Sequence, residues 1–140
     1  MDEQNQGKGQ CLCGAVGIMA SNMNTQAGTC HCRMCRRWSG GPLMTVDCGT
    51  DVTFSGEDHI TLYESSEWAR RGFCSQCGSH LFYLLKEDGR YFVPVGLFDS
   101  EEQFQFDHQI FIDKKPSFYS FANVTDNLTE EEVFSKYLDK

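Results

Sequence analysis

Positive charge is scarce in this chain of 140 residues. It has 12 lysine and arginine residues against 20 aspartate and glutamate residues, which gives a formal net charge of −8. Sequence-independent nucleic-acid binding depends on lysine and arginine side chains that neutralise phosphates. The composition therefore argues against nucleic acid as a partner.

Long apolar runs are also missing. No stretch approaches the ~20 consecutive apolar residues that a membrane-spanning helix needs, so we expect no membrane partner. The segment 1–8 is polar and lacks the apolar core of a secretory signal peptide. We therefore expect a cytoplasmic protein, in a compartment where thiols stay reduced.

The chain is rich in cysteine instead. Seven of its eight cysteines fall in three short segments, 11–13, 30–35 and 74–77. In a reducing compartment, such clusters indicate metal ligands before disulfides. Zinc bound by four protein ligands is structural, whereas zinc bound by three keeps one position for chemistry. The segments hold two, three and two cysteines in turn. The two pairs can make one complete four-thiolate site, which leaves the three cysteines of the middle segment.

The two outer pairs are suited to one structural zinc. The pair in 74–77 is followed by Gly78, which relaxes the tight turn that two thiolates need to reach one metal. Alternating apolar residues over 11–19 predict a strand that aims Cys11 and Cys13 the same way. We predict a structural zinc site formed by Cys11, Cys13, Cys74 and Cys77.

The middle segment differs, because it offers three thiols and no obvious fourth ligand. Cys30, Cys32 and Cys35 lie within six consecutive residues. His31 stands between two of them, and in an extended segment its side chain would point away from theirs. Cys48 is the spare thiol, either a fourth ligand or a buried free cysteine.

A zinc ion with three thiolates favours particular chemistry. Three thiolates on Zn²⁺ leave a net charge of −1, a weaker Lewis acid than the tris-histidine zinc that acidifies bound water. Binding and deprotonation of an incoming thiol suits this site better. Arg36 and Arg37 either hold carboxylates of a thiol substrate or offset thiolate charge. Trp38 follows them and could line a substrate groove.

The remaining pattern predicts a mainly β chain. Short runs of strand-forming residues lie between turn signals, at 29–32, 43–46, 52–54, 60–63, 80–85 and 91–95, with 110–112 as a further candidate. Thr129 and Glu132 form a capping-box pattern that opens a short C-terminal helix. We expect a flexible leader at 1–9 and a single domain over 10–140.

The cysteine motifs and their neighbours, in this order, resemble the glutathione-dependent formaldehyde-activating enzyme family, a domain also present in centromere protein V. The similarity spans about residues 10–125. The matching segments are Cys11-x-Cys13-Gly14-Ala15-Val16, Cys30-His31-Cys32-x-x-Cys35-Arg36-Arg37-x-Ser39-Gly40 and Arg71-Gly72-Phe73-Cys74-x-x-Cys77-Gly78-Ser79-x-Leu81-Phe82. One departure is Phe118-Tyr119, where members often carry a tryptophan after the Lys-Pro turn.

This resemblance implies an Mss4-like (β-tent) fold with two zinc ions per chain. The structural ion would bind the two outer pairs, and the catalytic ion would bind Cys30, Cys32 and Cys35. The implied activity is that of a carbon–sulfur lyase that joins a glutathione-like thiol to a small aldehyde, formaldehyde in the founding type.

Two other interpretations stay open. In one, Cys48 completes the second site, both zinc sites are closed, and the chain is a non-catalytic scaffold. In the other, the density of thiolates serves a thiol-redox or zinc-buffering role.

Overall fold

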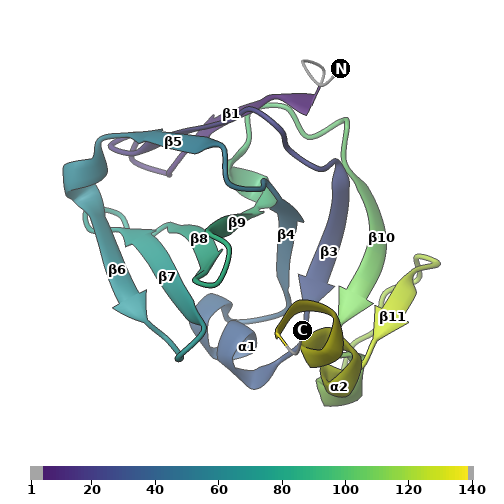
Figure 1. Ribbon diagram of the computed structural model, residues 1–140. Helices are drawn as coiled ribbons and strands as arrows, with labels where there is room; N and C mark the ends of the chain where they lie inside the picture. Colours follow the sequence, from purple (N-terminus) through teal and green to yellow (C-terminus); the bar gives the residue numbers. More distant parts are fainter. Residues whose placement is uncertain (1–4, 139–140) are drawn as a thin grey trace. The chain divides into compact units, whose positions relative to one another are not determined.

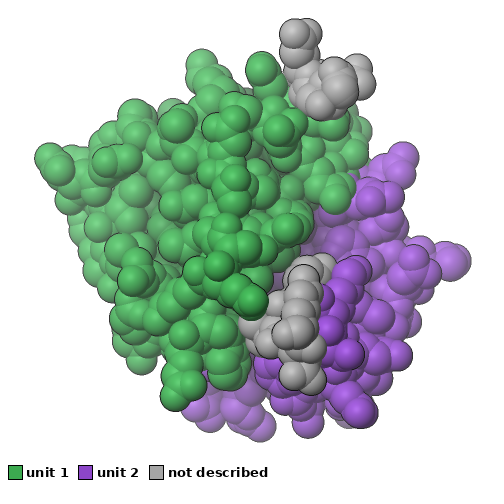
Figure 2. Space-filling model, viewed as in Figure 1, with its two compact units in different colours: residues 1–25, 46–104 green, residues 26–45, 105–140 purple. Residues whose placement is uncertain are grey.

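The computed structural model describes residues 5–138, which form two compact units (Figure 2). The first unit comprises residues 1–25 and 46–104, and the second comprises residues 26–45 and 105–140. A single domain over 10–140 stays a prediction. Strand β1 (Gly7–Gln10) begins inside the expected leader, of which residues 1–4 lie outside the described part. No helix within residues 5–138 is long and apolar enough to cross a membrane.

The first unit contains two antiparallel sets of strands (Figure 1). One has the order β1-β2-β5, with β2 at Gly17–Ala20 and β5 at Val52–Ser55. The other has the order β6-β7-β8-β9. Its strands are Ile60–Glu64, Ala69–Cys74, His80–Leu85 and Arg90–Pro94. Two short 3-10 turns, Glu57–His59 and Val95–Leu97, follow β5 and β9.

Three aromatic rings of the first unit form a cluster, in which Phe82 is buried and the other two are half-buried. Phe54, Phe82 and Tyr91 contact one another with ring centroids 5.0–5.5 Å apart. Such tilted and edge-on pairs add to the free energy gained by burying their surface. The side chains of Val16 and Val93, also in the first unit, are fully buried.

The second unit joins segments that are far apart in sequence. Its strand order is β11-β10-β3-β4, with bounds Asp126–Leu128, Gln105–Ile110, Gln26–Cys30 and Leu43–Asp47, the last two residues of β4 belonging to the first unit. Strand β10 is parallel to both β3 and β11, and β3 is antiparallel to β4. Helix α1 (Arg33–Ser39) joins β3 to β4, and the 3-10 turn Ile112–Lys114 follows β10. Helix α2 (Glu130–Val133) continues into a π-helical turn at 134–138.

The mainly β prediction with a short C-terminal helix is confirmed. Strands β3 to β6, β8 and β9 lie where the sequence patterns place them, within two or three residues at their ends. The capping box also forms: Thr129 Oγ1 accepts from the Glu132 N–H, and Glu132 Oε1 accepts from the Thr129 N–H.

Two sequence predictions are wrong in part, and some elements are not predicted at all. The segment 11–19 is not one strand, because a turn occupies 11–15 and β2 begins only at Gly17. The candidate strand 110–112 is the end of β10, since Phe111 adopts a left-handed φ of 56° that stops the strand. The sequence patterns do not predict helix α1, strands β7 and β11, or the first five residues of β10. Helix α1 has only seven residues, which is too few to show a helical pattern of apolar residues.

The capping box gives a test of the C-terminal helix. Thr129→Ala removes the cap of α2 and should lower the free energy of unfolding by about 1 kcal/mol. Urea denaturation of the variant and of Glu131→Ala, an exposed position in the same turn, measures this difference. An equal loss in the two variants would contradict a specific role for the cap.

Candidate metal centres

Four cysteine thiols converge in the first unit. The Sγ atoms of Cys11, Cys13, Cys74 and Cys77 all lie within 4.8 Å of one another. The Sγ–Sγ distance is 3.7 Å between Cys11 and Cys13 and 3.8 Å between Cys13 and Cys74. Tetrahedral zinc with Zn–S bonds of about 2.3 Å sets its sulfurs about 3.8 Å apart. A disulfide would need about 2.05 Å, so this cluster fits a four-thiolate zinc.

Two tight turns present these thiols. The Gly14 N–H donates to Cys11 O, and the Gly78 N–H donates to Cys74 O. Both glycines have left-handed φ angles, +82° and +79°, that a residue with a Cβ adopts only with strain. The sulfurs accept backbone N–H groups as well: Val16 N lies 3.3 Å from Cys11 Sγ, and Gln76 N lies 3.4 Å from Cys74 Sγ. These donors favour the charged thiolates that a metal binds.

Ser79 ties the two turns together. Its Oγ accepts the Leu12 N–H at 3.0 Å and lies 3.1 Å from Cys77 Sγ. The hydroxyl accepts from one cysteine turn and can donate to a Cys77 thiolate in the other. Hydrogen bonds from the Ser79 hydroxyl and backbone lower the pKa of the Cys77 thiol to about 5. Ser79 thus supports the site from outside the ligand set.

A second cluster lies in the second unit, at the β3–α1 junction. The Sγ atoms of Cys30, Cys32 and Cys35 lie within 4.8 Å of one another. Cys30 ends β3, and Cys32 is the N-cap of α1, where its Sγ accepts the Cys35 N–H at 3.3 Å. Cys35 is buried inside the first turn of α1, and the other two are partly buried. A strand end and a helix start thus bring three thiols of a six-residue segment together.

The neighbouring thiols oppose the ionisation of Cys30. The neighbouring thiols of Cys32 and Cys35, together with burial, raise the pKa of Cys30. Soft thiolate donors suit zinc, and a bound cation would relieve this repulsion. The three residues therefore fit a metal ion in their donor type and spacing.

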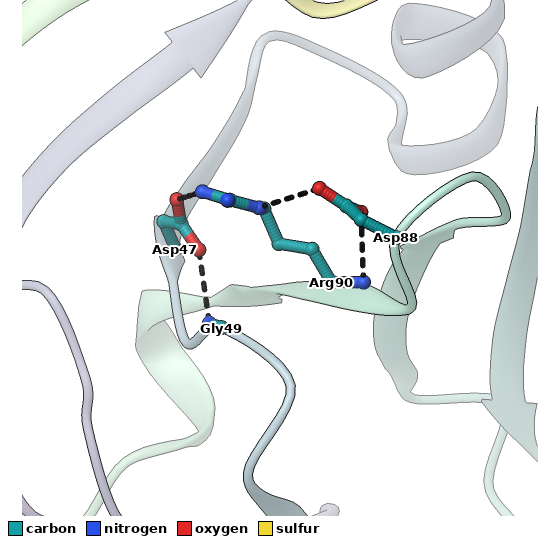
Figure 3. Close-up of polar contacts among 4 residues, drawn as sticks. All are labelled: Asp47, Gly49, Asp88 and Arg90. Atoms are coloured by element: carbon teal, nitrogen blue, oxygen red, sulfur yellow. Dashed lines mark hydrogen bonds and ion pairs between the residues drawn. The ribbon is translucent and has the colours of Figure 1, made fainter.

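Cys48 lies in the first unit, in a turn held at both ends. The Cys48 N–H donates to Tyr91 O, and the Tyr91 N–H donates to Gly49 O, both within 2.9 Å. Arg90 bonds Asp47 at 2.6 Å and Asp88 at 3.3 Å, and the Gly49 N–H donates to Asp47 (Figure 3). The Cys48 thiol is fully buried, and burial raises its pKa to about 12. Such a thiol is unreactive as it stands, and whether it ligates a metal stays open.

His31 points away from the thiols and into a buried polar network. Its ring is completely buried, with Nε2 2.7 Å from Gln109 Oε1 and Nδ1 2.8 Å from the Tyr119 hydroxyl. Burial lowers the pKa of His31, because the charged imidazolium loses its hydration. Its ring nitrogens are thus bonded to protein groups other than the cysteines.

The predicted substrate-binding residues all lie on α1. The guanidinium of Arg36 donates from Nε to His31 O at 2.8 Å and from Nη2 to Lys114 O at 3.5 Å. Arg37 is exposed, and Trp38 is half-buried. Backbone carbonyls thus occupy part of the Arg36 donor set, and Arg37 is the more accessible cation.

Sequence reasoning missed the residues that support both clusters. Ser79 stands two positions after Cys77, within the segment that resembles the family. A hydroxyl so close to a pair of predicted metal ligands was the available signal. Gln109 and Tyr119 gave no such signal, because 78 and 88 residues separate them from His31.

Comparison with known proteins gives the family. A sequence model of the glutathione-dependent formaldehyde-activating enzyme family matches residues 6–114. The chain belongs to this family. A Schizosaccharomyces pombe protein described as an uncharacterized lyase is 36% identical over 127 residues, which cover 90% of this chain and 93% of that protein. A Rhodobacter sphaeroides protein of known crystal structure is 28% identical, with a TM-score of 0.58 over 66% of this chain and 88% of the other.

Family membership, together with the lyase relative, supports an enzyme of the glutathione-dependent formaldehyde-activating type. The match begins four residues before the expected similarity and ends before residue 125. It includes both cysteine clusters whole.

The two clusters should respond differently to loss of a ligand. Cys74→Ser should lose one zinc and much of the folded population, because 61 residues separate Cys13 from Cys74 and cross-linking such a loop is worth about 4 kcal/mol in the chain-entropy model. Cys35→Ser should lose the other zinc and stay largely folded. Native mass spectrometry and thermal unfolding measure both quantities. Equal destabilisation by the two variants would contradict this division.

Ser79 should control how firmly the four-thiolate site holds its metal. Ser79→Ala removes both the donor to Cys77 and the acceptor for Leu12, and zinc release to a chelator should be about ten-fold faster. Ser75→Ala, an exposed serine of the same turn, is the matched control and should release zinc at the unaltered rate. Identical rates in both variants would show that Ser79 has no such role.

Proposed function

We propose that the chain is a zinc-dependent carbon–sulfur lyase that joins a glutathione-like thiol to a small aldehyde. The observation that carries this proposal is the contrast between the clusters: one gathers four thiols and the other gathers three. Three protein ligands on zinc leave a coordination position for an exogenous group. Family membership supports the same class of reaction.

A thiol is the exogenous ligand that best suits the cluster of Cys30, Cys32 and Cys35, called the triplet below. A zinc ion held by Cys30, Cys32 and Cys35 would bind a thiol sulfur and lower its pKa. Water is a poorer partner, because three thiolates leave little positive charge to acidify it. The three cysteines would therefore hold the metal through soft sulfur donors and leave the site with a low net charge. Both properties favour a sulfur ligand.

Helix α1 would supply the contacts to the rest of the thiol molecule. A glutathione-like substrate carries carboxylates, and Arg37 offers an exposed guanidinium two residues after Cys35. Arg36 has five N–H donors, of which Nε and Nη2 already bond backbone carbonyls. Its remaining donors would contact the same carboxylates. Trp38 completes the predicted substrate-binding set. A reducing cytoplasm suits so many free thiols.

The reaction itself needs no further reactant. The sulfur lone pair forms a C–S bond to the carbonyl carbon while the C=O π pair moves to oxygen. The proton that leaves the thiol ends on that oxygen, and a hydroxymethyl thioether results. Because thiols add to formaldehyde unaided, the task of the protein is to bind and orient the two partners.

Titration with glutathione tests the proposal. In protein loaded with Co²⁺ at both clusters, glutathione should shift the thiolate-to-metal charge-transfer bands, because a fourth sulfur joins the triplet metal. S-methylglutathione, which lacks the thiol, should leave them unchanged, and Cys32→Ser should abolish the response.

Two results would overturn the proposal. One is no spectral change at millimolar glutathione. The other is four sulfurs around both metals by X-ray absorption in thiol-free buffer, which would indicate a closed second site and a scaffold role.

A further inference from the structure

His31, which lies between Cys30 and Cys32, is held by hydrogen bonds on both its ring and its backbone. The ring of His31 is bonded on both nitrogens, to Gln109 Oε1 and to the Tyr119 hydroxyl. Its backbone is bonded as well: the His31 N–H donates to Ile110 O at 3.1 Å, and His31 O accepts from Arg36 Nε at 2.8 Å. Every polar atom of His31 thus has a partner: two partners belong to β10, one belongs to α1, and Tyr119 lies in the segment after β10.

The hydrogen bonds of the network run in one direction. Gln109 donates from Nε2 to Thr125 Oγ1 at 2.9 Å, so its oxygen faces His31. His31 Nε2 therefore carries the ring proton, and Nδ1 accepts from the Tyr119 O–H. Thr125 in turn lies 2.7 Å from Asn127 Oδ1, to which its hydroxyl donates. A neutral His31 with one tautomer satisfies every member.

The network lies on the face of β3 that is turned away from the metal ligands. Successive side chains of an extended segment point to opposite faces, so His31 faces one way and the flanking cysteines face the other. Gln109 is paired with Thr29 in the parallel ladder of β10 and β3, which places it on the His31 side. His31 therefore cannot ligate the metal, but it fixes the two peptide units that join Cys30 to Cys32.

We propose that His31, locked by Gln109 and Tyr119, is a positioning residue that sets the spacing of Cys30 and Cys32 for metal binding. A preformed ligand geometry binds metal more tightly than one that must be ordered on binding. The inference requires a metal at the triplet but does not require the aldehyde reaction, so the two proposals can fail separately.

Tyr119→Phe is the sharpest test, because it removes one hydroxyl and keeps the ring. His31 Nδ1 then loses its donor inside a buried site, and the imidazole is free to change tautomer or rotate. Removing a supporting hydrogen bond of this kind lowers metal affinity 10–100-fold in known sites, and we expect about ten-fold here. Tyr63→Phe makes the same chemical change at an exposed position of the first unit and is the matched control.

Competitive chelator titration of the two-zinc protein gives the affinity of each cluster. Tyr119→Phe should weaken the triplet site about ten-fold and leave the four-thiolate site unchanged. In metal-free protein, the His31 amide should exchange faster with solvent, and ¹⁵N shifts of the ring should lose the single-tautomer signature. Thr125→Val, one bond further along the network, should show the same changes to a smaller extent.

Other results would overturn the proposal. Unchanged triplet affinity in Tyr119→Phe would show that the spacing of the cysteines does not depend on the His31 ring. Equal weakening of both clusters would show a general loss of stability rather than positioning. Weakening of the triplet site by Tyr63→Phe would remove its specificity.

Discussion

Thiolates repel one another at short range, and each unit of this protein brings cysteine Sγ atoms within 4.8 Å of one another. At such distances, like charges raise the cost of ionisation, as the elevated pKa of Cys30 illustrates. A cation that bridges the sulfurs turns this cost into stability. The surrounding turns serve the same end, because their N–H groups and the Ser79 hydroxyl point at sulfur.

The two clusters solve this problem with different chain geometry. In the first unit, two glycine turns from distant parts of the sequence meet, and the ligands themselves hold the turns together. In the second, the ligands are local, and the distant residues supply support instead: Gln109 and Tyr119 reach His31 from the chain beyond β9. The four-thiolate cluster thus needs its metal to join two distant segments. The three-thiol cluster instead relies on distant residues to hold its ligands in place.

The sequence predicts the cysteine sets and the strand-rich class well, because both depend on short spacing. Ligand pairs lie within a few residues, and strands β5, β6, β8 and β9 are runs rich in β-branched, aromatic and other large apolar residues between turns. The prediction fails where long-range contacts decide. Segment 11–15 alternates like a strand, yet it forms a turn whose Leu12 N–H donates to Ser79 Oγ, 67 residues further along the chain. Strand β11 has no apolar alternation of its own and forms by parallel pairing with β10. The support of His31 spans 78 and 88 residues, which no local pattern records.

The spacing of the clusters along the chain also sets the order in which a ribosome delivers them. The triplet is complete once residue 35 has emerged, and bringing ligands together over six residues costs little loop-closure entropy. The four-thiolate site must wait for Cys77, a further 42 residues, or about 2–8 s at ordinary rates of synthesis. A nascent chain therefore carries the three thiols of the second unit, still without the support of Gln109 and Tyr119, before the four-thiolate site can form. Metal captured early at the triplet would occupy the chain before the first unit has the ligands to compete for it.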